Sequence, residues 1–169
     1  APVMAADFTI TSGTTTNDGN TISTGDTVTV TGALVTTGVD IGIYNTGGTS
    51  TVSVSEAGSI TTGTGDHAIG IYNFNGSTNT TTVSGSITTA GFGAHGIWNN
   101  GNFNTTTVSG SIGTTGNFAN GIYTGNSSST NTTTVSGSIT TAGSSANGIR
   151  TYGDDNVTTI SGTVKATGA

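Results

Sequence analysis

The residues best suited to acid–base or metal chemistry are two histidines. His67 and His95 each lie just before a Gly-Ile dipeptide, at similar places in successive stretches of the chain. A neutral imidazole can bind a metal ion or exchange a proton near neutral pH. Other stretches carry Asn120 and Asn147 at this place, so we interpret the histidines as variation on a solvent-facing position.

Other groupings that could do chemistry are incomplete. Asp154 and Asp155 form the only adjacent acidic pair, which falls short of the about six to eight oxygen ligands that calcium takes. The glycine clusters precede no expected helix, so they form no phosphate-binding loop. No set of serine, histidine and aspartate recurs as in a groove that cleaves polysaccharides. We therefore expect no catalytic residue, no metal site and no cofactor.

Aromatic residues form a candidate interaction strip, because one follows the Gly-Ile dipeptide in most copies. The column reads Tyr44, Tyr72, Trp98, Tyr123 and then Arg150. If it is exposed, such a strip can stack on sugars or contact a protein partner. If it lies against a corner, it only enlarges the core, and the pattern leaves both interpretations open.

Threonines that alternate with apolar residues form a second candidate surface. They are Thr27, Thr29, Thr51, Thr80, Thr82, Thr105, Thr107, Thr132 and Thr134. A flat Thr-X-Thr array on a solenoid resembles the ice-binding faces of β-helical antifreeze proteins. Threonine is also a common residue of soluble strands, so ice binding is an alternative rather than the leading interpretation.

A repeat of about 26 residues positions these columns. Asn-Thr-Thr-Thr-Val-Ser-Gly-Ser-Ile occurs at residues 79–87, 104–112 and 131–139, with a degenerate copy at 156–164. The Gly-Ile dipeptides begin at residues 42, 70, 96, 121 and 148, which gives spacings of 28, 26, 25 and 27. A unit of this size cannot bury its own apolar face, so neighbouring units must stack.

Alternation within the repeat predicts strands. If Val83 points inward, Thr81 and Ile87 share its side while Thr80 and Thr82 point outward. The same phase gives three aliphatic columns, namely Val30, Val54, Val83, Val108, Val135 and Ile160; Leu34, Ile60, Ile87, Ile112, Ile139 and Val164; and Ile43, Ile71, Ile97, Ile122 and Ile149. The columns predict an all-β fold, a parallel β-solenoid of about six coils with roughly three short strands in each.

Polar residues inside this pattern need partners. Asn79, Asn104, Asn131 and Asn156 open each motif, and amides stacked at a coil corner can bond one another and tolerate left-handed backbone. We expect a structural ladder there; the alternatives are ligand binding and glycosylation of the Asn-X-Thr triplets. The inward hydroxyls of Thr81, Thr106, Thr133 and Thr158 need hydrogen-bond partners as well.

Composition excludes several classes. The chain has 30% hydrophobic and 6% charged residues, no cysteine and a net charge of −6, with Arg150 and Lys165 as its only strong cations. This balance argues against binding to nucleic acid or an anionic membrane, and the lack of cysteine excludes disulfides. No apolar run is long enough to span a bilayer. Residues 3–7 resemble the end of a secretory signal, although an arbitrary chain boundary is the alternative.

The unit Asn-Thr-Thr-Thr-Val-Ser-Gly-Ser-Ile-Thr-Thr-Ala-Gly, followed by Gly-Ile-Tyr, resembles the passenger repeats of Gram-negative autotransporter proteins over about residues 20–164. The resemblance implies a right-handed β-helix secreted by the type V pathway, as in adhesins and surface fibres. It also implies an extracellular or cell-surface location in a Gram-negative bacterium, and it brings no catalytic residues with it.

The expected organisation has three parts. Residues 1–20 form an N-terminal arm or cap, with residues 1–6 as a remnant of signal cleavage. Residues 21–164 form the solenoid. Residues 165–169 form a C-terminal end that continues into further chain or assembles with another copy. A last coil in full repeat phase leaves an unpaired edge, which predicts head-to-tail self-association or continuation in a longer chain.

The expected function is that of a non-catalytic extracellular structural or adhesive protein, either a passenger segment or a self-assembling filament subunit. A surface glycan or a protein is the expected ligand, and neither nucleic-acid binding nor membrane insertion is expected. The alternatives are an ice-binding protein and a carbohydrate-binding or carbohydrate-active β-helix.

Overall fold

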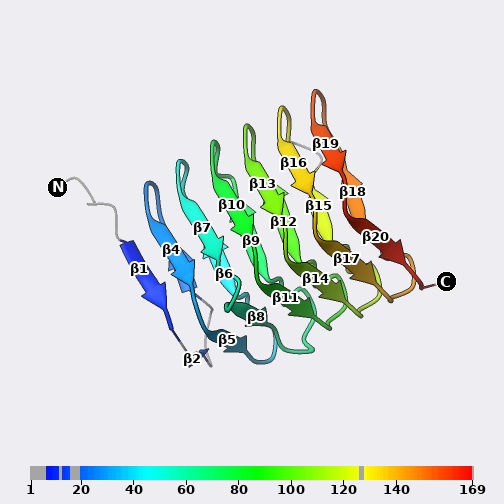
Figure 1. Ribbon diagram of the computed structural model, residues 1–169, viewed down its shortest axis with the longest axis horizontal. Coiled ribbons are helices and arrows are strands. Elements are labelled where there is room, and N and C mark those ends of the chain that lie inside the picture. The colour runs from blue at the N-terminus through cyan, green and yellow to red at the C-terminus, as the bar shows by residue number, and fades with distance from the viewer. Residues whose placement is uncertain (1–6, 12, 16–19, 126–127, 169) are drawn as a thin grey trace.

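The computed structural model describes residues 7–11, 13–15, 20–125 and 128–168 as a stack of parallel β-coils (Figure 1). These residues contain twenty strands and no helix. Successive strands along the chain belong to three different sheets, and each strand pairs with its counterparts in the neighbouring coils. The predicted all-β parallel solenoid of about six coils with three strands each is therefore confirmed.

The three sheets run along the length of the rod. The threonine sheet contains β1 (Asp7–Ile10), β4 (Thr27–Val30), β7 (Thr51–Val54), β10 (Thr80–Val83), β13 (Thr105–Val108), β16 (Thr132–Val135) and β19 (Val157–Ile160). The serine sheet contains β2 (Gly13–Thr15), β5 (Ala33–Thr36), β8 (Ser59–Thr61), β11 (Ser86–Thr89), β14 (Ser111–Thr114), β17 (Ser138–Thr141) and β20 (Thr163–Ala166). The aromatic sheet contains β3 (Asn20–Ile22), β6 (Ile43–Asn45), β9 (Ile71–Phe74), β12 (Ile97–Asn100), β15 (Ile122–Thr124) and β18 (Ile149–Thr151).

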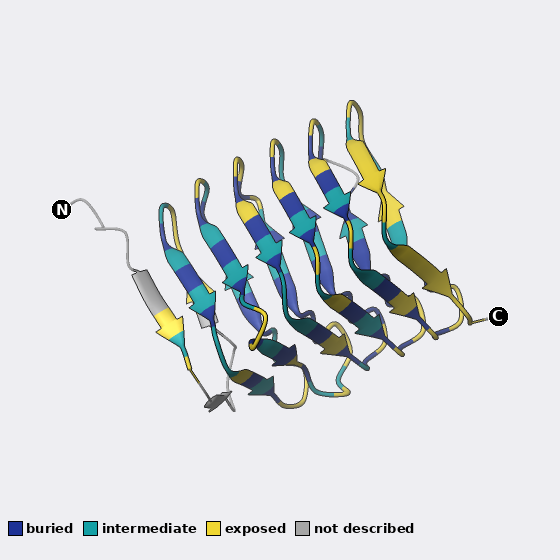
Figure 2. Ribbon diagram, in the orientation of Figure 1, coloured by how far each residue is buried: buried dark blue, intermediate teal, exposed yellow. Residues whose placement is uncertain are grey.

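The core consists of the three predicted aliphatic columns. Val83 pairs in register with Val54 on one side and Val108 on the other. Members of all three columns are fully buried in the middle coils, and Figure 2 shows this burial alternating along the strands of the threonine sheet. Equivalent residues therefore stack from coil to coil, as the shared phase predicted.

The inward threonines find partners on the aromatic sheet. The Asn73 side-chain amide donates to the Thr81 hydroxyl at 3.1 Å, and Asn99 donates to Thr106 at 3.0 Å. Thr158 keeps the register of the inward Thr133, but it lies in the last coil and is exposed. A position inside the solenoid is covered only where a further coil stacks over it.

The glycine of each Gly-Ile dipeptide allows the core to close. A Cβ on Gly96 would lie 2.4 Å from Cγ2 of Ile112 and 2.6 Å from the carbonyl oxygen of Gly121. Neither the aliphatic column nor the stacked backbone leaves room for a side chain at this point. The dipeptide recurs because the aromatic sheet turns against the serine sheet here.

The ends of the chain take part in the stack. Within the expected arm or cap, β1 pairs with β4 and β2 pairs with β5, so the described part of this segment covers the first full coil; residues 1–6 lie outside the described residues. At the other end, β20 continues to Ala166 and pairs with β17, beyond the expected boundary at residue 164. The last coil is largely exposed (Figure 2).

Candidate functional site

The aromatic strip lies on the outer face of the aromatic sheet. Tyr44, Tyr72, Trp98 and Tyr123 are half-buried, while the isoleucine before each of them is buried in the core. In the register of the aromatic sheet, Tyr44 pairs with Tyr72, Tyr72 with Trp98, and Trp98 with Tyr123. Of the two interpretations left open by the sequence, the structure therefore supports an outward strip.

The N-terminal part of the strip is a closed ladder of rings. The Tyr44 and Tyr72 ring centroids are 5.5 Å apart, and those of Tyr72 and Trp98 are 4.5 Å apart with planes only 18° from parallel. Rings stacked along the rod axis cover one another's faces. A sugar cannot enter between them, so this part of the strip offers mainly ring edges.

The ladder changes direction after Trp98. Tyr123 lies 5.4 Å from Trp98 with its plane turned by 66°, and it stacks instead on His95 at 4.8 Å. His95 in turn meets Trp98 edge to face at 5.5 Å. The turn in the stack opens a hollow beside Trp98 and Tyr123.

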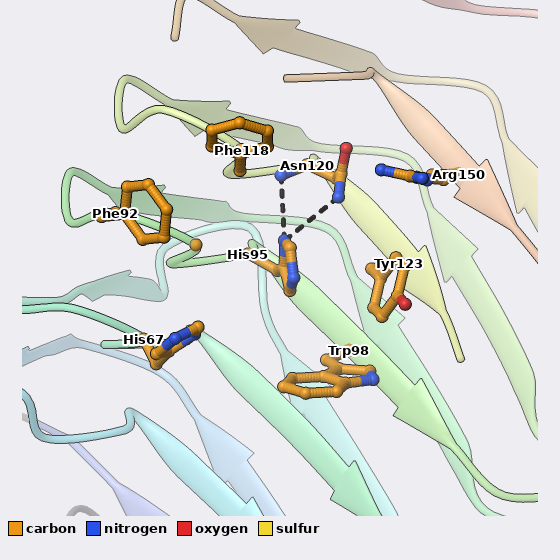
Figure 3. A pocket seen from close by; sticks show the side chains of 9 residues that line it. His67, Phe92, His95, Trp98, Phe118, Asn120, Tyr123 and Arg150 are labelled. Atoms are coloured by element: carbon orange, nitrogen blue, oxygen red, sulfur yellow. Dashed lines mark hydrogen bonds between the residues drawn. The ribbon is translucent and has the colours of Figure 1, made fainter. Parts of the chain in front are cut away.

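This hollow, which we call the aromatic groove, has a volume of about 360 Å³ (Figure 3). Its lining residues come from four successive coils and are His67, Phe92, Gly93, His95, Trp98, Phe118, Asn120, Tyr123 and Arg150. The side of the groove opposite Trp98 and Tyr123 is formed by Phe92 and Phe118, whose rings are 5.3 Å apart and whose side chains are 47% and 48% exposed. A mostly apolar hollow with a few polar groups is typical of a ligand site.

His95 is buried at the base of the groove, so the prediction that it faces solvent is wrong. Its Nδ1 accepts a hydrogen bond from the backbone N–H of Asn120 at 2.9 Å. In the next coil the Asn120 side-chain oxygen accepts from the backbone N–H of Asn147 at the same distance. In both coils the side chain at this position supplies an acceptor for a backbone N–H group of the next coil. His67 is exposed, as expected.

Burial lowers the pKa of His95 to about 4, and the electrostatic interactions with His67 and Arg150 act in the same direction. Desolvation disfavours the charged imidazolium. The ring is therefore neutral at pH 7, and because Nδ1 accepts a hydrogen bond, its proton is on Nε2.

A left-handed turn presents side chains at one edge of the groove. His67, Gly93 and Phe118 hold equivalent places in three successive turns, with φ of +57°, +60° and +57°. Ser145 continues the series at +56°. A positive φ is unusual outside glycine, and here it is repeated because each turn stacks on the previous one.

Arg150 occupies the C-terminal end of the groove. It stands where the other coils carry Tyr44, Tyr72, Trp98 and Tyr123, and it is exposed. Its guanidinium lies 4.9 Å from the centroid of the Tyr152 ring and donates to the Tyr152 hydroxyl. Among the described lining residues there is no carboxylate, so Arg150 makes this end of the groove positive.

The predicted threonine columns lie on the outer face of the threonine sheet. Thr80, Thr105 and Thr132 are exposed and pair in register, and Thr82 and Thr107 beside them are half-buried. The remaining predicted members, Thr27, Thr29, Thr51 and Thr134, are also half-buried and outward. The columns form the regular array that the sequence predicted, on a different sheet from the aromatic groove.

The corner asparagines form the expected structural ladder. The backbone N–H of Asn79 donates to the side-chain oxygen of Asn104 at 2.9 Å, and that of Asn104 donates to Asn131 at 2.7 Å. The left-handed residue is not the asparagine itself but the residue before it, for example Thr78 with φ of +63°. The ladder holds this turn closed from coil to coil.

A second ladder lies inside the rod and was missed in the sequence. The Asn45 amide donates to Asn73 at 3.0 Å, and Asn73 donates to Asn99 at 2.8 Å. The asparagine that closes Gly-Ile-Tyr-Asn and Gly-Ile-Trp-Asn was its signal. Thr124 ends the ladder in the coil of Tyr123.

The described residues contain no cluster of three or more histidine, aspartate or glutamate side chains that could hold a metal ion. Asp154 and Asp155 are exposed at the corner of the last coil. No described helix is long and apolar enough to cross a bilayer.

Comparisons with models of known protein families, with curated proteins and with solved structures found no match.

Proposed function

We propose that this chain is a non-catalytic structural and adhesive β-solenoid on the outside of a Gram-negative cell, either a passenger segment or a filament subunit. Its role is display: a stiff rod holds a ligand-binding groove away from the surface and continues beyond its last coil. The repeat resemblance supports the location.

The observation that carries the proposal is the uncovered end of the core. Ile160 and Val164 are 50% and 36% exposed, whereas their counterparts Val135 and Ile139 are fully buried. Apolar columns that end in solvent favour another coil stacking on them, and the free edge of β19 favours strand pairing. That coil belongs either to a longer chain or to a second copy joined head to tail.

Sedimentation velocity and electron microscopy over rising protein concentration test this proposal. We expect elongated oligomers or filaments, and we expect Val164→Asp to prevent them because it places a charge in the joint. Val39→Asp is the matched control, since Val39 is an exposed valine in the loop between β5 and β6. A chain that stays monomeric, or an equal effect of both variants, contradicts assembly through this end.

Continuation in a longer chain has its own test. A chain lengthened by a further copy of residues 145–169, which continues the register of β17 and β20, should unfold at a higher temperature, because the added coil covers Ile160 and Val164. No gain in thermal stability would contradict the idea that the end accepts another coil.

Ice binding is the second candidate, and the in-register threonine columns of the threonine sheet favour it. We expect no thermal hysteresis from the unmodified chain, because threonine also serves simply as a soluble strand residue. A clear hysteresis gap that Thr107→Tyr removes would reverse this order.

A further inference from the structure

We propose that the aromatic groove binds an acidic oligosaccharide, with sugar rings against Phe92, Phe118 and Trp98 and a sugar carboxylate on Arg150. The inference deepens the proposed display role by naming the class of ligand. It rests on the groove alone and not on the joint at the last coil, so the two proposals can fail separately.

The aromatic walls favour a ligand with alternating apolar and polar surfaces. Phe92 and Phe118 expose nearly half of their surface, although each lies in a turn whose other copies carry small or polar residues such as Asn117 and Ser144. Large exposed apolar side chains gathered on one face of a soluble protein mark an interaction site. Carbohydrate rings present C–H groups to such side chains while their hydroxyls remain in contact with polar groups.

A peptide strand fits the groove less well. The backbone N–H groups of His67, Gly93 and Phe118 already donate to carbonyl oxygens of the next coil at 2.8–2.9 Å. The Asn120 N–H donates to His95. Addition of an extended peptide depends on free main-chain groups at a sheet edge, whereas a sugar needs only side-chain donors and acceptors. The Asn120 amide, the His95 Nε2–H and Arg150 are side chains of this kind in the lining.

Charge selects an acidic sugar over a neutral one. The whole chain carries a formal charge of −6 and only two strong cations, and one of the two stands at this groove. The neutral state of His95 leaves Arg150 as the fixed positive charge of the lining. A guanidinium pairs with a carboxylate through two parallel hydrogen bonds, and the coils place this charge at the end of the aromatic walls.

The groove is also long enough for an oligomer. Its lining extends over four coils, from His67 to Arg150. Three steps at the spacing of paired strands, about 4.8 Å each, give roughly 14 Å along the rod axis. A ligand lying parallel to the axis can therefore contact the phenylalanines and Arg150 together.

The test is a titration of the isolated chain with a galacturonic acid oligomer and with the methyl ester of the same oligomer. Trp98 is the only tryptophan in the chain, so its fluorescence reports directly on the groove. We expect a saturable change with the acid and at least about tenfold weaker binding of the ester, as for hydrogen bonds to charged groups. Arg150→Gln should reduce acid binding to the level of the ester.

Two phenylalanine variants test whether the ligand binds in the groove or on any exposed apolar side chain. Phe118→Ser introduces the residue that the next coil carries as Ser145, and we expect it to weaken both ligands by about three- to tenfold. Phe103→Thr removes another exposed phenylalanine at a different corner, where Thr78 and Thr130 are its counterparts. It should leave both affinities unchanged. Circular dichroism checks that each variant keeps its β-structure.

The proposal is overturned if neither oligomer changes the fluorescence at millimolar concentration, or if Phe118→Ser and Phe103→Thr have the same effect. It is also overturned if Arg150→Gln leaves the preference for the acid intact. Binding of an apolar peptide in place of both oligomers would assign the groove to a protein partner instead.

Discussion

Val135 of β16 and Ile160 of β19 hold the same position in neighbouring coils, yet one is fully buried and the other is half exposed. The same holds for Ile139 and Val164 on the serine sheet. The residue types are alike, so the difference comes from what lies above each coil. In this rod, burial is a property of the stack: a coil contributes its aliphatic residues fully only when another coil covers it.

The largest expected effect contrasts the middle of one column with its end. Ile112→Ala should lower the free energy of unfolding by roughly 2–5 kcal/mol, because Ile112 is enclosed by Ile87 and Ile139 and a cavity remains. Val164→Ala should cost less than about 1 kcal/mol, since its site is partly open to water. Chemical denaturation measures both, and equal costs would mean that the last coil is as well packed as the middle ones.

The columns behind this contrast were predictable, because a strand repeats every two residues and the coil repeats about every 26. Val83, Ile87 and Ile97 therefore all showed the correct inward phase in the sequence. The aromatic groove was not predictable in the same way. It arises where His95 turns Tyr123 out of the ladder, and the repeat pattern treated His95 as an exposed variant of Asn120.

Phe92 and Phe118 illustrate the same limit. They occupy different places in their turns, so they form no column in the sequence, but the stacked coils bring their rings to 5.3 Å. Residues that depart from the repeat in different coils can therefore lie side by side in the folded rod. Regular positions predict the fold, whereas the irregular ones that form the groove had to be located in the structure.

The second prediction uses pH to distinguish His95 from Asn120, the acceptor at the same position in the next coil. The pKa of His95 in the folded chain, about 4, lies below the ordinary histidine value of 6.5. The unfolded chain thus binds the proton more readily, so the stabilising contribution is complete above pH 6.5 and is lost as the pH falls toward 4. We expect a loss of roughly 3 kcal/mol over that range.

The matched variant for this prediction is His95→Asn, which introduces the residue that the next coil uses as acceptor, Asn120. In this variant the free energy of unfolding, measured by denaturation at several pH values, should no longer fall between pH 6.5 and 4. The control is His67→Asn in the neighbouring turn, in which the free energy of unfolding should still fall over this pH range. A fall that persists in His95→Asn would assign the acid sensitivity to another group.

The smallest expected effect compares a corner asparagine of a middle coil with its counterpart in the last coil. Asn104→Ala leaves the buried backbone N–H of Asn79 without its acceptor, so we expect a cost of about 1–3 kcal/mol. Asn156→Ala should cost less, because Asn156 is half-buried and water can reach the N–H of Asn131. Thermal unfolding of the two variants makes the comparison, and a larger cost at Asn156 would contradict it.

Amide hydrogen exchange on β16 and β19 tests the central claim, that the last coil is a joining surface, most directly. Among the described strands, β16 pairs with β13 and β19 on its two sides, whereas β19 pairs with β16 alone. In dilute solution we predict slow exchange throughout β16 and fast exchange at the amides of β19 that face away from β16. At concentrations where oligomers form, those β19 amides should become as protected as β16. Oligomers that leave β19 unprotected, or a dilute monomer in which β19 is already protected, would contradict the account.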